Sequence, residues 1–181
     1  MSDDSIILGF DPGLQGAVAA LRLDGVALWA RPLPVRLLPP RGKRGRTLRL
    51  LDAEALARML TLERDGIALA AVEEVGARPR DARRGAFAFG RGLGTIEGVL
   101  ATLHFPVRLV RPQDWKAEVL GPRTTEEDWS KRVAVEYAFR RFPGVALVPP
   151  RCRNAHEGMA EALLICEWGR RRLAGEREGA A

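Results

Sequence analysis

Two carboxylates stand where this sequence predicts buried positions. Asp11 closes the apolar run 5–10, and Glu73 closes the apolar run 67–72. An ionised carboxylate is costly to bury unless it is paired or bound to a cation. Side chains alternate between the two faces of a strand, so only one of Glu73 and Glu74 can share a site with Asp11. We predict that Asp11 and Glu73 meet; the alternatives are a turn cap at Asp11 and a surface edge at Glu73.

A second pair of acids lies near the end of the chain. Glu157 and Glu161 are four residues apart, which places them on one face of a helix, where like charges repel each other. The small residues Gly158 and Ala160 between them leave room for another backbone or a ligand. An ordinary exposed helix face is the alternative.

Together these four side chains offer only oxygen ligands. Oxygen donors without a cluster of cysteine or histidine suit a hard cation such as Mg²⁺ or Mn²⁺. Two such ions about 4 Å apart would clamp the attacking water and the leaving oxygen in phosphodiester hydrolysis. We therefore predict two Mg²⁺ ions per active site, for which Mn²⁺ can substitute. The predicted ligands are Asp11, Glu73, Glu157 and Glu161.

The charge of the chain favours a nucleic-acid partner. The formal net charge is +6, and only three of the 29 basic residues are lysines. The arginine fork matches phosphate oxygens, although an arginine-rich code in a GC-rich genome is the alternative. The segments 38–50 and 76–84 are predicted to be basic loops that contact DNA phosphates, with a solvated linker as the alternative for the first. The candidate contacts are Arg41, Lys43, Arg44, Arg46, Arg78, Arg80, Arg83 and Arg84.

Several other classes of protein are disfavoured. No apolar stretch approaches the roughly 20 residues that cross a bilayer, and Asp3 and Asp4 stand where a signal peptide carries basic residues. Cys152 and Cys166 fit no zinc or CxxC spacing, so both are expected to be reduced. We predict a cytoplasmic protein without membrane contact, in which residues 1–181 form a single domain.

Hydrophobic periodicity predicts an α/β fold. The predicted strands are 5–10, 16–23, 26–30, 67–75 and 107–110, and the predicted helices run from Asp52 to Asp65-Gly66 and over 85–103, 126–141 and 155–173. This order, βββαβαβαα, indicates an antiparallel meander that continues into a mixed five-stranded sheet with helices on both faces. The core is expected at about 5–173, and the tail 174–181 is expected to fray. Ligands collect beyond strand C-termini in such sheets, where Asp11 and Glu73 both fall.

The helix predicted at 85–103 carries an apolar stripe. Such a stripe is typical of a core face, and an interface with a second copy of the chain is the alternative. Its members are Phe89, Leu93, Ile96, Leu100 and Leu103.

Several segments resemble the RuvC family of Holliday junction resolvases. They are Ile-Ile-Leu-Gly-Phe-Asp-Pro-Gly at 6–13, Ala-Val-Glu-Glu-Val at 71–75 and Ala-Glu-Ala-Leu-Leu-Ile at 160–165. Phe-Gly-Arg-Gly-Leu-Gly at 89–94, with Glu97-Gly98, and Val-Arg-Pro-Gln-Asp-Trp-Lys at 110–116 look similar to phage-type and other short members. Each motif alone is weak, but the set covers roughly residues 5–170 in the family's order and spacing.

The resemblance implies an RNase H-like fold and a homodimer that makes paired nicks across a four-way DNA junction. It carries the family's first-strand aspartate to Asp11, its fourth-strand glutamate to Glu73 and its last-helix aspartate to Glu161. Glu157 matches a further helix carboxylate, although bacterial members space that pair three residues apart instead of four. His156 is an alternative ligand or proton shuttle, or else a structural cap. The cytosol of a bacterium or of a phage-infected host is the expected setting.

Two further features compare differently with the family. Bacterial members carry an aromatic wedge shortly after the strand glutamate, whereas this chain has Gly76 and then four arginines, so junction opening is expected to rely on charge. Lys116 and Lys131 match phosphate-contacting lysines near the site. Arg132 competes with Lys131 for that role, and an ordinary surface charge is the alternative for each.

Other functions fit parts of the sequence. A nuclease of the same fold that acts on flaps, forks or RNA–DNA hybrids is the main alternative, because basic loops bind many branched substrates through phosphate contacts. A non-catalytic junction-binding protein is expected to lack one or more of the carboxylates, and none is missing. Gly-Phe-Asp-Pro-Gly at 9–13 also resembles a phosphate loop of actin-like ATPases and sugar kinases, which need a second similar domain for which 181 residues leave little room.

Overall fold

The computed structural model describes residues 4–40, 47–62, 65–74, 76, 83–125 and 127–179. Its main sheet has five strands in the order β3-β2-β1-β6-β7. The strands are β1 (Ile6–Asp11), β2 (Ala17–Arg22), β3 (Ala27–Pro32), β6 (Ile67–Glu73) and β7 (Val107–Val110). β1, β2 and β3 pair antiparallel, and β6 joins β1 and β7 in parallel. The predicted meander and mixed α/β sheet are confirmed.

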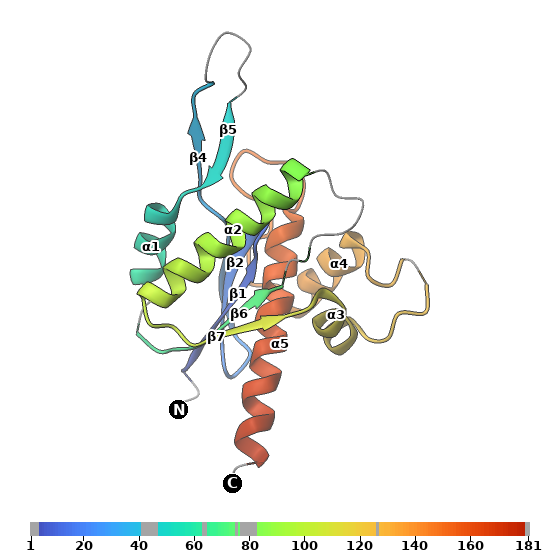
Figure 1. The fold of residues 1–181 in the computed structure, drawn as a ribbon. Helices are drawn as coiled ribbons and strands as arrows, with labels where there is room; N and C mark the ends of the chain where they lie inside the picture. Colours follow the sequence, from blue (N-terminus) through green and yellow to red (C-terminus); the bar gives the residue numbers. More distant parts are fainter. Residues whose placement is uncertain are drawn as a thin grey trace.

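Helices cover both faces of this sheet (Figure 1). One face packs against α1 (Ala53–Thr61) and α2 (Arg83–Thr102), and the other against α5 (Glu157–Gly179), which in turn contacts α3 (Pro112–Leu120) and α4 (Lys131–Arg141). The central strands are buried on both sides, so their sequences are almost continuously apolar.

Alternation along β1 sends its side chains to the two layers in turn. Leu8 and Phe10 are fully buried in the cluster that includes α1 and α2. Gly9 faces α5, and a Cβ built on it would lie 2.3 Å from the carbonyl oxygen of Ala162. Any larger residue at position 9 would therefore push α5 away from the sheet.

A two-stranded hairpin was not predicted. β4 (Val35–Leu38) pairs antiparallel with β5 (Leu48–Leu51), so the prediction of a loop over 38–50 is wrong at both of its ends. The prolines at 34, 39 and 40 flank β4 instead of interrupting it. α1 begins as predicted, since Asp52 Oδ1 accepts a hydrogen bond from the Ala55 N–H at 3.0 Å. Such a cap stabilises a helix by about 1 kcal/mol.

Other boundaries also differ from the prediction. α3 was missed, although Pro112 stands at its first turn, where its missing N–H costs nothing. The helix expected from residue 126 begins at Lys131, because the Ser130 side chain accepts from the Val133 N–H and caps it there. α2 begins at Arg83, inside the segment predicted as a loop.

The tail 174–181, for which fraying is predicted, is helical as far as Gly179, where α5 ends. An ion pair between Arg108 of β7 and Glu176, at 2.8 Å, ties these last turns to the edge of the sheet. Within the described ranges, no helix combines the length and the apolar character that a bilayer crossing needs.

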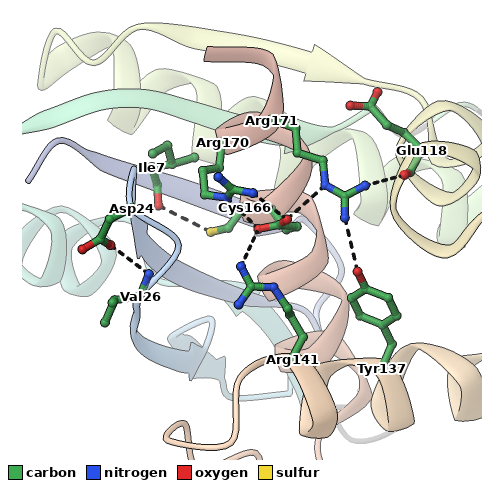
Figure 2. Close-up of polar contacts among 10 residues, drawn as sticks. Ile7, Asp24, Val26, Glu118, Tyr137, Arg141, Cys166, Arg170 and Arg171 are labelled. Carbon is green, nitrogen blue, oxygen red and sulfur yellow. Dashed lines mark hydrogen bonds and ion pairs between the residues drawn. The ribbon is translucent and has the colours of Figure 1, made fainter. Parts of the chain in front are cut away.

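A buried ionic cluster holds α5 against α4 and α3 (Figure 2). The Glu167 side chain is only 2% exposed, and it accepts hydrogen bonds from Arg170 at 2.8 and 2.9 Å and from Arg171 at 3.0 Å. Arg171 also donates to the Glu118 carbonyl at 2.6 Å and to the Tyr137 hydroxyl at 3.3 Å. Arg141 of α4 adds a further charge at 3.8 Å. Glu167 therefore has cations on more than one side.

Candidate active site

Asp11 is the last residue of β1, and α5 begins directly against it. The Asp11 Oδ1 atom accepts a hydrogen bond from the Gly13 N–H at 3.3 Å. A Cβ built on Gly158 would lie 2.8 Å from Asp11 Oδ2 and 2.8 Å from the Gln15 carbonyl oxygen. The glycine predicted to leave room between the two helix glutamates thus lets α5 contact the loop that follows Asp11.

Glu73 reaches the same face of the sheet from β6. Phe10 pairs with Val72, so Asp11 and Glu73 come level at the ends of two parallel strands. Glu73 is partly buried and Glu74 is exposed, as the alternation rule requires. The Trp115 indole N–H donates to Glu73 Oε1 at 2.9 Å. Since Trp115 is fully buried, this bond holds the carboxylate to α3.

The electrostatics of Asp11 show which acids share its surroundings. Burial raises the pKa of Asp11 from 3.8 to about 7, together with the negative charges of Glu161 and Glu73. The Gly13 hydrogen bond and the charge of Lys131 act in the opposite direction but do not outweigh them. The structure therefore brings Glu161 and Glu73 close enough to Asp11 for their charges to act on it.

Two lysines offset these acids. Lys116 Nζ lies 3.3 Å from Glu161 Oε1, with both side chains less than one-fifth exposed. Lys131 Nζ lies 2.7 Å from Glu157 Oε2 at a more exposed position. The hydrogen bond with Glu157 raises the pKa of Lys131, as do the charges of Glu157, Glu161 and Asp11. Glu157 is thus joined to the other acids through Lys131.

In the part of the chain that the structure describes, no group of three or more histidine, cysteine, aspartate or glutamate side chains is arranged to hold a metal ion. The four predicted ligands therefore do not form one cluster: Glu161 and Glu73 act on Asp11, and Glu157 pairs with Lys131. The physical reason is that each helix glutamate is turned toward a lysine and Glu73 toward Trp115. The donor atoms nevertheless suit a hard cation, and the repulsion at partly buried Asp11 is what such a cation would relieve.

His156 caps α5. Its Nδ1 atom accepts the Met159 backbone N–H at 3.2 Å, which leaves Nε2 as the nitrogen available to a second partner. Burial lowers the pKa of His156, so the ring is neutral at neutral pH. This geometry supports the capping interpretation and requires no ligand role.

The predicted DNA contacts are only partly placed. Arg132 is exposed and pairs with Glu136 at 2.9 Å and Glu127 at 3.5 Å, whereas the charge of Lys131 reaches Asp11 and Glu161. The structure favours Lys131 over Arg132 as the cation of the site. Six other candidates lie outside the described residues: Arg41, Lys43, Arg44, Arg46, Arg78 and Arg80. Arg83 and Arg84 lie in α2, where only their backbone is described.

Trp115 was missed as a residue of the site. The sequence held one signal, since Pro112 predicts the start of a helix that includes Trp115. The hydrogen bond to Glu73 depends on how α3 packs, which no local pattern encodes.

The fold is similar to solved structures of RuvC. One is a Thermus thermophilus RuvC in complex with a Holliday junction substrate, with a TM-score of 0.58 and 19% identity over 94% of this chain and 96% of that one. Another Thermus thermophilus RuvC structure has a TM-score of 0.53 and 18% identity over the same shares. The yeast mitochondrial Holliday junction resolvase Ydc2 gives a TM-score of 0.48 and 14% identity over 98% and 82%.

At these identities the likeness shows the fold, and the predicted RNase H-like fold of RuvC is confirmed. No protein-family model matches the chain, and no curated protein matches it. The likeness to phage-type members stays a prediction.

Proposed function

We propose that this chain is a divalent-metal-dependent endonuclease that resolves four-way DNA junctions. The observation that carries the proposal is that Asp11 and Glu73 come level at the ends of two paired strands, where Glu161 also acts on partly buried Asp11 and raises its pKa. Acids gathered at the end of a sheet are unfavourable for folding, so a function must explain them. Binding of cations beside a scissile phosphate explains both these acids and the basic surroundings.

Asp11, Glu73, Glu161 and Glu157 are the proposed ligands of two Mg²⁺ ions, for which Mn²⁺ would substitute. When bound, the ions would supply charge neutralisation at the phosphate and a lower pKa for the attacking water. The chain's own lysines have a complementary role. In the structure Lys116 pairs with Glu161, and Lys131 pairs with Glu157. If these glutamates turned to bind the cation, both lysines would be able to bind a DNA phosphate.

The Trp115 indole orients Glu73, and the His156 ring fixes the start of α5 beside Asp11. These two groups are proposed to position the acids without touching substrate. Orientation of ligands by such neighbours is a general feature of metal sites.

A four-way junction is the proposed substrate. Support comes from the shared fold with a RuvC that was solved with a Holliday junction substrate, together with the net charge of +6. Nuclease action on flaps or forks is the second candidate, because phosphate contacts alone do not select a branched shape.

A cleavage assay separates these proposals. Purified protein is incubated with a four-way junction, a flap, a fork and a linear duplex, each with Mg²⁺ or with EDTA. Symmetric, Mg²⁺-dependent nicks in the junction are expected. Preferential flap cutting would favour the second candidate, and binding without cutting of any substrate would indicate a non-catalytic junction-binding protein.

Paired nicks require two active sites, so we propose a homodimer. Phe89 of α2 remains 46% exposed, whereas Ile96 and Leu100 of the same predicted stripe are fully buried in the core. Phe89 is therefore the residue of this stripe that we propose contacts a second copy of the chain. Light scattering is expected to give twice the chain mass of 19.9 kDa, and Phe89→Glu should shift it to the monomer.

A further inference from the structure

A groove of about 390 Å³ lies between the β4–β5 hairpin and the first turns of α2. Leu48 and Leu50 of β5 line it on one side, and Phe87 and Ala88 of α2 line it on the other. Phe87 is 72% exposed and Leu48 is 50% exposed, so this apolar wall is open to solvent. The volume is within the range of small-molecule binding sites, which is about 300–1,000 Å³.

Three arginines line the same groove, namely Arg36 of β4, Arg49 of β5 and Arg91 of α2. None of the described residues that line it is acidic. Among the described residues, none of these three guanidinium groups has a carboxylate partner. The groove thus combines an apolar wall with positive charge that nothing described in the chain neutralises.

The groove adjoins the loop of the proposed active site. Leu14, which also lines it, lies three residues after Asp11. At Gly92, the next residue of α2 along the wall, an added Cβ would lie 3.1 Å from the Pro12 carbonyl oxygen. Figure 1 shows the hairpin projecting beyond the sheet at the end where α2 begins. A ligand in the groove would therefore contact the segment that positions Asp11.

We infer that the groove receives an unpaired nucleotide of branched DNA, with its base on Phe87 and its phosphates at the three arginines. The inference rests on the proposed function and names the part of the substrate that this chain's hairpin binds. Every base has an aromatic face that stacks on an aromatic side chain, and arginine forks match phosphate oxygens. A second copy of the chain fits the groove less well, because a two-fold contact there would bring like charges together.

The test uses two fluorescently labelled four-way junctions in EDTA, one fully paired and one with two unpaired thymidines at the branch point. Wild-type protein is expected to bind the second about tenfold more tightly, the effect of stacking one base on an aromatic residue. The double variant Arg49→Gln/Arg91→Gln and the groove-filling variant Ala88→Trp should lose this preference, while binding of the paired junction changes less than about threefold. Arg140→Gln, at an exposed arginine of α4, removes a charge elsewhere and should keep it.

Thermal melting of each variant checks that it is folded. An absent preference in the wild type, or a preference that survives Ala88→Trp, would overturn the inference. So would a change from dimer to monomer in Ala88→Trp with the preference intact, because the groove would then be an interface between copies. If the protein cuts the paired junction with Mg²⁺ but does not prefer the junction with unpaired thymidines, only the inference about the groove is rejected. If it shows that binding preference but cuts no substrate, only the proposed nuclease function is rejected.

Discussion

Two carboxylates, Glu167 on α5 and Asp11 against the first turn of α5, have opposite electrostatic surroundings. Glu167 accepts hydrogen bonds from two arginines and lies near a third, whereas Asp11 lies beside two other acids. Burial raises the pKa of Glu167, but the hydrogen bonds of Arg170 and Arg171 outweigh it and the net shift is downward. At Asp11 burial and the neighbouring charges act in the same direction and raise the pKa to about 7.

The difference separates a structural group from a proposed functional one. The chain supplies the partners of Glu167 itself, and the result is a link between α3, α4 and α5. Asp11 is repelled by the charges of Glu161 and Glu73, and a bound cation would relieve this repulsion. Groups with such unrelieved shifts concentrate at functional sites.

The largest expected effect is that of Asp11→Asn on cutting. The change removes a carboxylate of the proposed metal site, so cutting of a four-way junction should fall by roughly 10³-fold, the upper range for loss of one electrostatic group. Junction binding in EDTA should stay the same or tighten, because the phosphate then meets less negative charge. Asp24→Asn makes the same chemical change at the β2–β3 turn and should leave cutting intact. Near wild-type cutting by Asp11→Asn would mean that the metal site is wrongly assigned.

Glu167→Gln should have the reverse profile. Removing one partner of a buried ionic cluster leaves the arginines uncompensated, which typically costs about 3–5 kcal/mol of unfolding free energy. Chemical denaturation measures this loss, and cutting per folded molecule should be unchanged. Glu176→Gln breaks an exposed ion pair with Arg108 and should destabilise the protein far less. If Glu167→Gln is stable but no longer cuts, Glu167 belongs to the active site. The distinction between a structural Glu167 and a functional Asp11 would then be wrong.

Trp115→Phe tests whether Glu73 is held for function. The variant keeps most of the buried ring but loses the N–H that donates to Glu73 Oε1. Loss of such an orienting neighbour costs roughly 10–100-fold in metal affinity or activity. The Mg²⁺ concentration for half-maximal cutting should therefore rise, which a purely structural role would not cause. Trp129→Phe loses a comparable N–H bond, to the Gly121 carbonyl, and should leave the Mg²⁺ requirement unchanged.

The sequence predicted the strands and the meeting of Asp11 with Glu73 because both depend on local rules. Apolar runs predict buried strands, and the two-residue period of a strand decides which of Glu73 and Glu74 faces the site. The β4–β5 hairpin was missed because its strands are short and flanked by prolines and arginines.

The partners of the acids were harder to predict. Lys116 and Lys131 were expected to contact phosphate, and their pairing with Glu161 and Glu157 follows from how α3 and α4 pack against α5. The contacts of Trp115 with Glu73 and of Arg141 with Glu167 also depend on the packing of helices. Trp115 and Glu73 are 42 residues apart in the sequence. Contacts between helices distant in the chain leave no periodic signal in a single sequence.

The last prediction concerns pH, and its effect is smallest per step, because the stability change per pH unit is limited and has opposite sign for Asp11 and Glu167. In EDTA, Asp11 has a raised pKa, so its ionised form destabilises the fold above about pH 7, by an upper bound of about 4 kcal/mol for a rise from 3.8. Stability relative to Asp11→Asn should therefore increase as the pH falls from 7 toward 4, by at most about 1.4 kcal/mol per pH unit. Glu167 has a lowered pKa, so its contribution is present above pH 4.5 and is lost as the pH falls through the folded value. Denaturation of the wild type, Asp11→Asn and Glu167→Gln from pH 8 to pH 3 measures both slopes. If the two variants differ from the wild type with the same pH slope, the contrast between these carboxylates is wrong.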